Sequence, residues 1–193
     1  MKVGVLISGT GTNLQALIDD PEIDVACVVS SRADAAGLDR ARSAGIPVLA
    51  TADEDETARF LEGAGVGLVV LAGYMRILSR EFVGRFSGRI MNVHPALLPA
   101  FPGAHAVRDA LDHGVRVTGV TVHLVDVGHV AADSGPIVLQ EALDVSYDDG
   151  ADEVAGRLHE IEHRLLPQAV RLFCSGRLEV DGRRVLVREK RRA

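Results

Sequence analysis

Two polar residues at the end of a short apolar run, Asn92 and His94, are the first candidates for chemistry in this sequence. They stand two positions apart, so their side chains point to the same face of an extended strand. Pro95 follows directly and ends strand pairing at that point. An amide and an imidazole held together at a strand end can bind a polarised carbonyl and transfer a proton. Taken alone, however, the N-x-H motif favours a structural role, in which both side chains bond to loop backbone groups.

Asp133 is the candidate acid for this pair, because the sequence DSGPIVLQ places it at the edge of an expected strand. A D-x-G-P turn is common and indicates little by itself. If the sheet brings Asp133 next to His94, the carboxylate can stabilise the imidazolium and relay a proton. Two other histidines stay open: His105 lies close enough in sequence to join the site, and His123, on an alternating strand, fits a structural role equally well.

The loop GTGTN at residues 9–13 follows the first apolar run and precedes a helical pattern. Backbone N–H groups in such a loop, with the positive end of the following helix, suit a phosphate group. The loop has no G-K-[ST] ending, so it is not the P-loop of nucleoside triphosphate-binding proteins. Leu14 replaces the third glycine of the dinucleotide fingerprint, and residues 30–32 hold no carboxylate for a ribose. A single phosphate is the favoured ligand, although a glycine turn without a ligand fits the motif as well.

The first half of the chain alternates between strands and helices that would position these residues. Strands are expected at residues 2–8, 24–30, 46–49, 66–72 and 90–93, and helices at residues 13–20, 35–44 and 106–113. A further helix should end at Leu61 with Thr51 or Asp53 as its cap, and Ser79 should cap a short helix. This alternation predicts right-handed βαβ units on a mostly parallel sheet, with the candidate residues at its carboxyl edge.

The second half of the chain has a different hydrophobic pattern. Residues 115–125 and 136–143 alternate over long stretches and predict a strand pair, with an antiparallel arrangement favoured. Residues 152–174 predict a long helix, and residues 177–180 and 183–187 a hairpin around Asp181 and Gly182. We therefore expect one α/β, Rossmann-like domain over residues 1–193, with its central sheet flanked by helices and a C-terminal helix and hairpin. Residues 1–100 would form the nucleotide-binding-like half, and residues 101–193 the other half.

Composition narrows the class of protein. The chain has 193 residues, 47% of them hydrophobic, and a net charge of −6, which argues against a general nucleic-acid binder. No apolar run is long enough to cross a membrane, and Met1 leads into an apolar strand rather than a signal peptide. Cys27 and Cys174 stand far apart in apolar segments, which predicts reduced cysteines of a cytoplasmic protein and no metal site. No G-x-S-x-G or Cys-His nucleophile pattern indicates a covalent acyl-enzyme.

Motifs along nearly the whole chain, from residue 3 to about residue 177, resemble those of the phosphoribosylglycinamide formyltransferase family of purine biosynthesis. They are LISGTGTNLQALID, SRADAAGLDRARSAGIP, VVLAGYMRILS, IMNVHPALLPAFPGAHA, GVTVHLV, DSGPIVLQ and EIEHRLLPQAV, in this order. The MNVHPALLPAFPG segment is similar to other folate-dependent formyltransferases and deformylases as well. The GTGTNLQAL loop resembles only the branch that acts on glycinamide ribonucleotide.

The resemblance implies transfer of a formyl group from 10-formyltetrahydrofolate to the amino group of glycinamide ribonucleotide, by direct attack and without a metal. The residues that match the family's functional positions fall into three groups. The catalytic trio is Asn92, His94 and Asp133; the nucleotide-binding residues are Gly11, Thr12, Asn13 and Glu162; the folate-binding residues are Met75, Arg76, Ile77, Leu78, Asn92 and Val93. The partners implied are small-molecule substrates, with no nucleic acid and no membrane, and a homodimer is compatible with the family.

Two departures from the family pattern concern the folate side. The segment between His123 and Asp133 is a few residues longer than usual, which makes Asp126 a second candidate for the catalytic carboxylate. Ala100 stands where the family has a basic residue. The alternatives are formyltetrahydrofolate deformylase, methionyl-tRNA formyltransferase, which would need a further RNA-binding domain, and a non-catalytic nucleotide-binding module. The phosphate loop speaks against the deformylase, and the complete catalytic trio speaks against the non-catalytic module.

Overall fold

The computed structural model describes residues 1–125 and 133–189. Asp126, the second candidate for the carboxylate, lies outside the described residues. The described residues form two compact units: Met1–Asn92 with Val125 make the first, and Val93–Leu124 with residues 133–189 make the second. The boundary between Asn92 and Val93 falls inside one strand.

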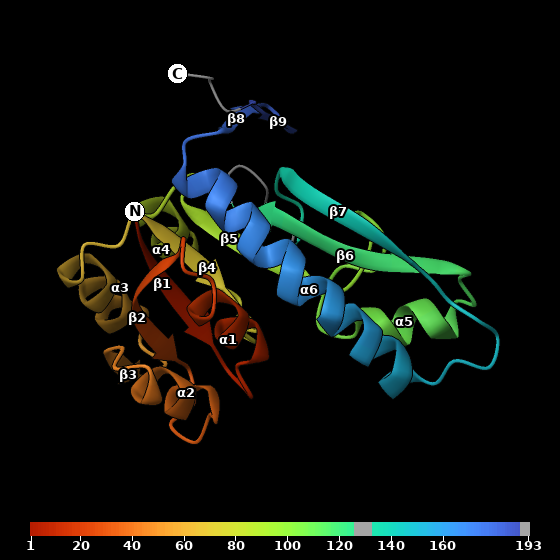
Figure 1. Ribbon diagram of the computed structural model, residues 1–193, viewed down its shortest axis with the longest axis horizontal. Helices are drawn as coiled ribbons and strands as arrows, with labels where there is room; N and C mark the ends of the chain where they lie inside the picture. The colour runs from red at the N-terminus through yellow and green to blue at the C-terminus, as the bar shows by residue number, and fades with distance from the viewer. Residues whose placement is uncertain (126–132, 190–193) are drawn as a thin grey trace. The chain divides into compact units, whose positions relative to one another are not determined.

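The order of elements follows the alternation expected from the sequence (Figure 1). The first unit contains β1 (Lys2–Ile7), α1 (Thr12–Ile18), β2 (Asp24–Ser30), α2 (Gly37–Ser43), β3 (Val48–Ala50), α3 (Glu54–Gly63), β4 (Leu68–Leu71), α4 (Arg80–Arg85) and the start of β5 (Ile90–His94). The second contains the end of β5, then α5 (Ala106–Asp112), β6 (Val117–Leu124), β7 (Ile137–Asp144), α6 (Ala151–Cys174), β8 (Leu178–Asp181) and β9 (Arg184–Val187).

Seven strands form one sheet in the order β3-β2-β1-β4-β5-β6-β7, and β8 and β9 form a separate hairpin. The pairs from β3 to β5 are all parallel, because a helix returns the chain to the same edge after each strand. The pair β6–β7 is antiparallel, as its long alternating pattern predicts. The mostly parallel α/β fold with a C-terminal helix and hairpin is thus confirmed.

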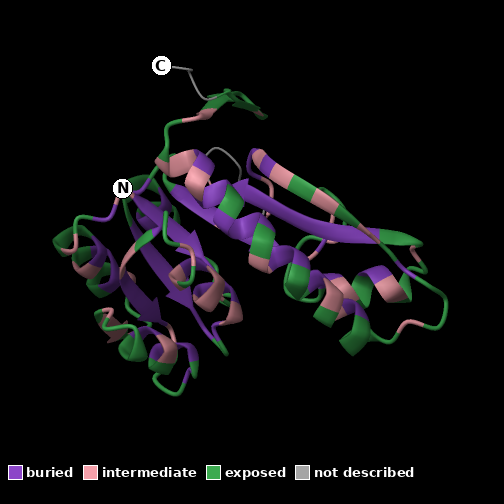
Figure 2. Ribbon diagram, viewed as in Figure 1, coloured by how far each residue is buried: buried purple, intermediate pink, exposed green. Residues whose placement is uncertain are grey.

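The central strands β1 and β4 are buried along nearly their whole length, which explains their continuous apolar sequences (Figure 2). On one face Leu6 of β1 joins a core cluster with Leu61 of α3 and Phe86 after α4. The next residue, Ile7, faces α2, because a Cβ atom added at Gly37 would lie 2.6 Å from its Cδ1 atom. Helices therefore cover both faces, and only the strand ends remain for a site.

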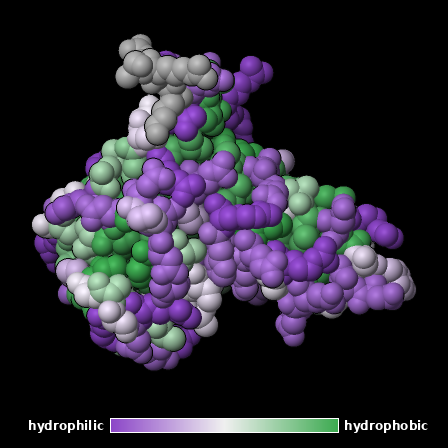
Figure 3. All heavy atoms as spheres, in the orientation of Figure 1, coloured by the Kyte–Doolittle hydropathy of each residue, from purple (hydrophilic) through white to green (hydrophobic). Residues whose placement is uncertain are grey.

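Helix α6 lies along β6 and β7 in the second unit (Figure 1). Its buried residues recur at helical spacing, as in Val154, Leu158, Ile161 and Leu165, and this stripe packs against the two strands. The face of α6 turned to the viewer in Figure 3 is mostly hydrophilic. An amphipathic helix on an antiparallel strand pair thus forms the core of this unit. No helix among the described residues is long and apolar enough to cross a membrane.

The helix caps in the first unit are residues that the sequence predicted, and the structure decides between the two candidates for α3. The Asp53 side chain accepts a hydrogen bond from the Glu56 backbone N–H at 2.8 Å, so Asp53 rather than Thr51 caps α3. Ser79 caps α4 as predicted, by accepting from the Phe82 N–H at 3.1 Å. The third strand begins at Val48, two residues later than its apolar pattern suggests.

Candidate active site

The carboxyl ends of β1, β4 and β5 lie at one edge of the parallel sheet in the first unit. The register pairs Leu6 with Leu71 and Leu71 with Asn92, so the segments after these strands leave the sheet together. The Ser8 N–H also donates to the Gly73 carbonyl at 3.1 Å, which joins the first of these segments to the second. This edge is where open α/β sheets bind ligands.

The predicted phosphate loop has a fixed backbone shape. Gly11 adopts the left-handed conformation, with φ 72° and ψ 31°, and helix α1 begins at the next residue. A Cβ atom at Gly11 would lie 2.6 Å from the Gly37 Cα atom, so only glycine fits at this position. A left-handed residue followed by a helical one turns successive N–H groups toward a common point, which is an anion-binding geometry.

The segment predicted to line a folate pocket is anchored at its base. The Met75 N–H donates to the Ser8 Oγ atom at 2.9 Å, and the hydroxyls of Ser8 and Ser31 lie 2.8 Å apart. Beyond this anchor, the side chains of Met75 and Ile77 are 67% and 88% exposed. The backbone of this segment is thus fixed at its base, while two of its large apolar side chains face solvent.

His94 ends β5 with both ring nitrogens near protein atoms. Its Nε2 atom lies 2.8 Å from the Phe101 carbonyl oxygen, and its Nδ1 atom lies 3.5 Å from Asp133 Oδ2. A carbonyl oxygen only accepts, so Nε2 carries a hydrogen and donates it to Phe101. His94 is buried, whereas Asn92, two residues earlier on β5, is only partly buried.

The structure places Asp133 next to His94. From the sequence, this contact was expected only if the sheet brought the two residues together. Asp133 Oδ2 also accepts the Gly103 N–H at 2.9 Å. Burial alone would raise the pKa of Asp133, but a hydrogen bond from His123, the bond from Gly103 and the charges of His94 and His123 outweigh it and lower the pKa to about 2. The carboxylate is therefore ionised at neutral pH.

His123 is the functional candidate that sequence reasoning left undecided. Its Nε2 atom lies 3.5 Å from Asp133 Oδ1, and its Nδ1 atom lies 3.0 Å from the Leu124 carbonyl oxygen. The Leu124 carbonyl only accepts, so Nδ1 carries a hydrogen, and Nε2 is the ring atom nearest the carboxylate. The side chain is buried on β6, and the available signal was a histidine on the buried face of an alternating strand. Two imidazoles thus flank one carboxylate.

Two polar residues that sequence reasoning missed hold the loop after His94. The Thr121 hydroxyl donates to the Ala96 carbonyl at 2.7 Å and accepts the Leu98 N–H at 3.0 Å. The Gln140 amide donates to the Leu98 carbonyl at 2.9 Å and to the Thr121 hydroxyl at 2.9 Å. This network fixes the loop whose later part supplies the carbonyl and N–H groups around His94 and Asp133.

Glu162 and His105 occupy opposite environments. Glu162 is only 5% exposed on α6, although glutamate on a helix usually faces solvent. This burial argues against the solvated alternative. His105 is exposed at the N-terminal end of α5, where nothing in its setting requires a catalytic role.

The expectation of no metal overlooked one spacing. His159 and His163 stand four residues apart on α6, which is a metal-ligand spacing on a helix, and their rings stack with centroids 6.3 Å apart. Within residues 1–125 and 133–189, however, no group of three or more histidine, cysteine, aspartate or glutamate residues is arranged to hold a metal ion. The pair alone supplies too few ligands for a structural site.

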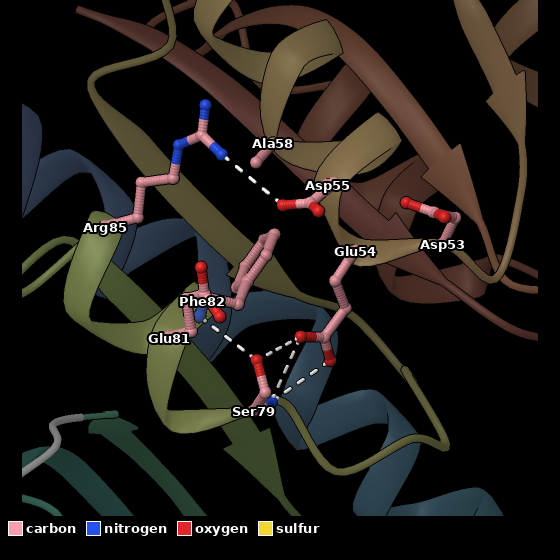
Figure 4. A pocket seen from close by; sticks show the side chains of 8 residues that line it. All are labelled: Asp53, Glu54, Asp55, Ala58, Ser79, Glu81, Phe82 and Arg85. Atoms are coloured by element: carbon pink, nitrogen blue, oxygen red, sulfur yellow. Dashed lines mark hydrogen bonds and ion pairs between the residues drawn. The ribbon is translucent and has the colours of Figure 1, made fainter.

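A hollow of about 220 Å³ lies between α3 and α4 (Figure 4). None of its lining residues is a predicted site residue. Polar side chains that line the hollow interact with one another. The Glu54 carboxylate accepts a hydrogen bond from the Ser79 backbone N–H at 3.1 Å, and the Arg85 NH1 atom lies 3.8 Å from Asp55 Oδ1. The hollow is therefore separate from the candidate chemistry.

Comparison with known proteins identifies the family. The family model described as formyl transferase matches residues 1–170. Phosphoribosylglycinamide formyltransferase from Haemophilus influenzae is 39% identical over 93% of this chain and 90% of its own length. The crystal structure of glycinamide ribonucleotide transformylase 1 from Symbiobacterium toebii superimposes with a TM-score of 0.93 at 45% identity, covering 98% of this chain and 94% of that one.

Larger relatives contain the same region as one part of their length. Trifunctional purine biosynthetic protein adenosine-3 from Drosophila melanogaster is 42% identical over 91% of this chain, which spans 14% of that relative. The similarity thus covers nearly all of this sequence both in relatives of its own size and within a multifunctional protein. The chain belongs to the formyl transferase family, within its phosphoribosylglycinamide formyltransferase branch.

Proposed function

We propose that this protein transfers the formyl group of 10-formyltetrahydrofolate to the amino group of glycinamide ribonucleotide. The observation that carries the proposal is the ionised Asp133 carboxylate between His94 and His123. It supplies a proton-relaying group in a chain whose family transfers formyl groups. The names of the relatives in the branch supply the acceptor and the pathway, purine biosynthesis.

Nucleotide binding is assigned to Gly11, Thr12, Asn13 and Glu162. The loop N–H groups would bind the phosphate, since Gly11 gives the loop an anion-binding shape. The buried Glu162 carboxylate would accept hydrogen bonds from the ribose hydroxyls. These roles need no charged side chain from the loop itself.

Folate binding is assigned to the segment after β4 and to the end of β5. The exposed side chains of Met75 and Ile77 support this role, because the apolar faces of a pteridine ring would cover them. The residues in this assignment are Met75, Arg76, Ile77, Leu78, Asn92 and Val93. The co-substrate carries the one-carbon unit, and no metal is required for the transfer.

The reaction forms one bond and breaks another without a covalent enzyme intermediate. The substrate amine attacks the formyl carbon, a new C–N bond forms, and the bond from that carbon to the folate nitrogen breaks. The Asn92 amide would donate to the developing oxyanion, a contact that often contributes about 3–4 kcal/mol. Asp133 would relay the proton from the amine to the departing nitrogen.

His94 would act mainly through its charge. Both its ring nitrogens already have protein neighbours, Phe101 and Asp133, so a direct hydrogen bond to the formyl oxygen would require one of these contacts to open. A fixed imidazolium would stabilise negative charge that develops nearby, and it would need no reorganisation during the reaction. It also keeps Asp133 ionised and oriented.

The test is a formyl-transfer assay with and without the nucleotide. We expect loss of 10-formyltetrahydrofolate together with formation of formylated nucleotide, and no turnover when the nucleotide is left out. Formate release without nucleotide would support the deformylase alternative instead. Nucleotide binding without any turnover would support a non-catalytic module. The homodimer and the cytoplasmic location expected from the sequence stay predictions.

A further inference from the structure

Arg40 of α2 is a half-buried cation beside the loop at residues 9–13. Its Nε atom donates to the Thr10 carbonyl at 2.9 Å, and its NH1 group donates to Gln15 Oε1 at 3.3 Å. Both acceptors are neutral. Within residues 1–125 and 133–189, no carboxylate forms an ion pair with Arg40, whereas Arg42 on the same helix pairs with Asp39 at 2.8 Å.

The hydrogen bonds from α2 set the direction of the loop N–H groups. The Gly9 carbonyl accepts the Gly37 N–H at 3.1 Å, and the Thr10 carbonyl accepts Arg40. In a planar trans peptide the carbonyl and the following N–H point in opposite directions. The N–H groups of Thr10 and Gly11 therefore point away from α2, and α2 holds both peptide planes.

The charge of Arg40 adds to this orientation. A guanidinium is always ionised, and among the residues that the structure describes no carboxylate neutralises this one where it lies against the loop. A partly buried charge is screened less than one in open solvent, so its field reaches a ligand on the other side of the loop. The uncompensated charge is what a phosphate with its two negative charges would balance.

We propose that Arg40 is a phosphate-affinity determinant of the nucleotide site, acting through the loop: it orients the Thr10–Gly11 peptide and supplies the positive charge that main-chain N–H groups lack. The inference rests on the proposed function, since it takes the loop at residues 9–13 as the phosphate site. Arg40 is a positioning residue rather than a catalytic one, because its hydrogen bonds go to the loop.

Two substitutions separate the effect of the Arg40 charge from the effect of its hydrogen bond to the Thr10 carbonyl. Arg40→Lys keeps the charge and loses the fork of donors, whereas Arg40→Gln keeps a donor and loses the charge. If the charge matters, Arg40→Gln should weaken nucleotide binding about tenfold and Arg40→Lys should weaken it less. Arg42→Gln, two residues along α2 and already paired with Asp39, is the matched control and should bind as the unsubstituted protein does.

The experiment measures nucleotide affinity by calorimetry, competition by inorganic phosphate, and KM for both substrates at low and moderate salt. We expect Arg40→Gln to raise KM for the nucleotide and the inhibition constant of phosphate by similar factors, to flatten their salt dependence, and to leave KM for the folate unchanged. If Arg40 only held the loop backbone in place, both Arg40 variants would instead lose thermal stability, and KM would rise for both substrates.

Equal nucleotide affinity in Arg40→Gln and the unsubstituted protein would overturn the inference. A larger loss in Arg40→Lys than in Arg40→Gln would overturn it too, because the donor geometry rather than the charge would then matter. Failure of the proposed function is a separate outcome: the unsubstituted protein would itself bind no nucleotide and transfer no formyl group.

Discussion

The loop at residues 9–13 and the cluster around Asp133 handle charge in different ways. The loop presents neutral main-chain groups, and its shape depends on a left-handed glycine. The cluster instead holds one carboxylate between two histidines and a backbone N–H. The first arrangement can bind an anion without changing protonation, whereas the second can accept and pass a proton. The loop is thus suited to binding, and the cluster is suited to proton transfer.

The two regions should also respond differently to substitution. In the loop, the orientation of peptide planes matters more than the identity of most side chains, so a change in backbone shape is the damaging one. In the cluster, the pKa of Asp133 depends on both histidines, so removal of either side chain changes the carboxylate. Substitutions in each region therefore test whether backbone shape governs the loop and whether charge governs the cluster.

The largest effect is expected for Asp133→Asn. The amide cannot take the amine proton, and we expect kcat to fall by about 10³-fold, within the range for loss of a general acid–base group. Nucleotide affinity should stay within about twofold, because the loop is untouched. Single-turnover kinetics and calorimetry measure the two quantities, and an unchanged kcat would remove Asp133 from the mechanism.

Gly11→Ala tests the loop by its backbone. The new Cβ atom would lie 2.6 Å from Gly37 Cα at φ +72°, which we expect to cost about 2 kcal/mol of stability and to weaken nucleotide binding by about 100-fold. Gly9→Ala is the control, because a Cβ atom there meets nothing within 4 Å. Denaturant unfolding and calorimetry report the effects, and similar behaviour of the two variants would contradict the account of the loop.

His123→Leu tests the coupling in the cluster. It removes the hydrogen bond that lowers the pKa of Asp133, so this pKa should rise from about 2 toward its ordinary value of 3.8. A lowered carboxylate pKa stabilises the fold above pH 3.8, and the effect is lost as pH falls toward 2. The variant should therefore be less stable at pH 7 by about 1–2 kcal/mol, with the part due to Asp133 vanishing near pH 2.

Urea unfolding across this pH range measures the stability difference for His123→Leu. Thr118→Val is a suitable control, since it changes a buried side chain on the same strand and leaves Asp133 alone. We also expect kcat to fall about tenfold in His123→Leu while nucleotide affinity persists. A stability difference that stayed constant from pH 7 to pH 2 would show that His123 acts by packing only.

The smallest effect is expected for Ser8→Ala. Loss of the Met75 N–H bond to Ser8 Oγ should loosen the segment at residues 75–78 and raise KM for the folate about fivefold, as for one hydrogen bond. Ser31→Ala keeps the Met75 bond and should change KM less. Steady-state kinetics with varied folate decides the matter, and equal effects of the two substitutions would count against the anchor.

Much of the fold follows from local pattern. The alternation of apolar runs and amphipathic segments predicts each strand and helix to within a few residues, because the periods of side-chain burial differ between the two structures. The boundaries of β3 and the choice of Asp53 over Thr51 as a cap needed the structure. The first depends on the pairing with β2 that begins at Val48, and the second on the Thr51 hydroxyl accepting the Asp53 N–H at 3.1 Å rather than an N–H of the helix.

Local sequence pattern was enough to predict the α/β alternation and the placement of Asn92 and His94 on one strand, since both depend on neighbours in the chain. The contact of His123 with Asp133 and the hydrogen bond from Arg40 to the Thr10 carbonyl, 30 residues away, became visible only in the folded chain. Local periodicity says which face a side chain takes but not which distant group it meets there. Long-range partners are set by how elements pack together, and that information is spread over the whole chain.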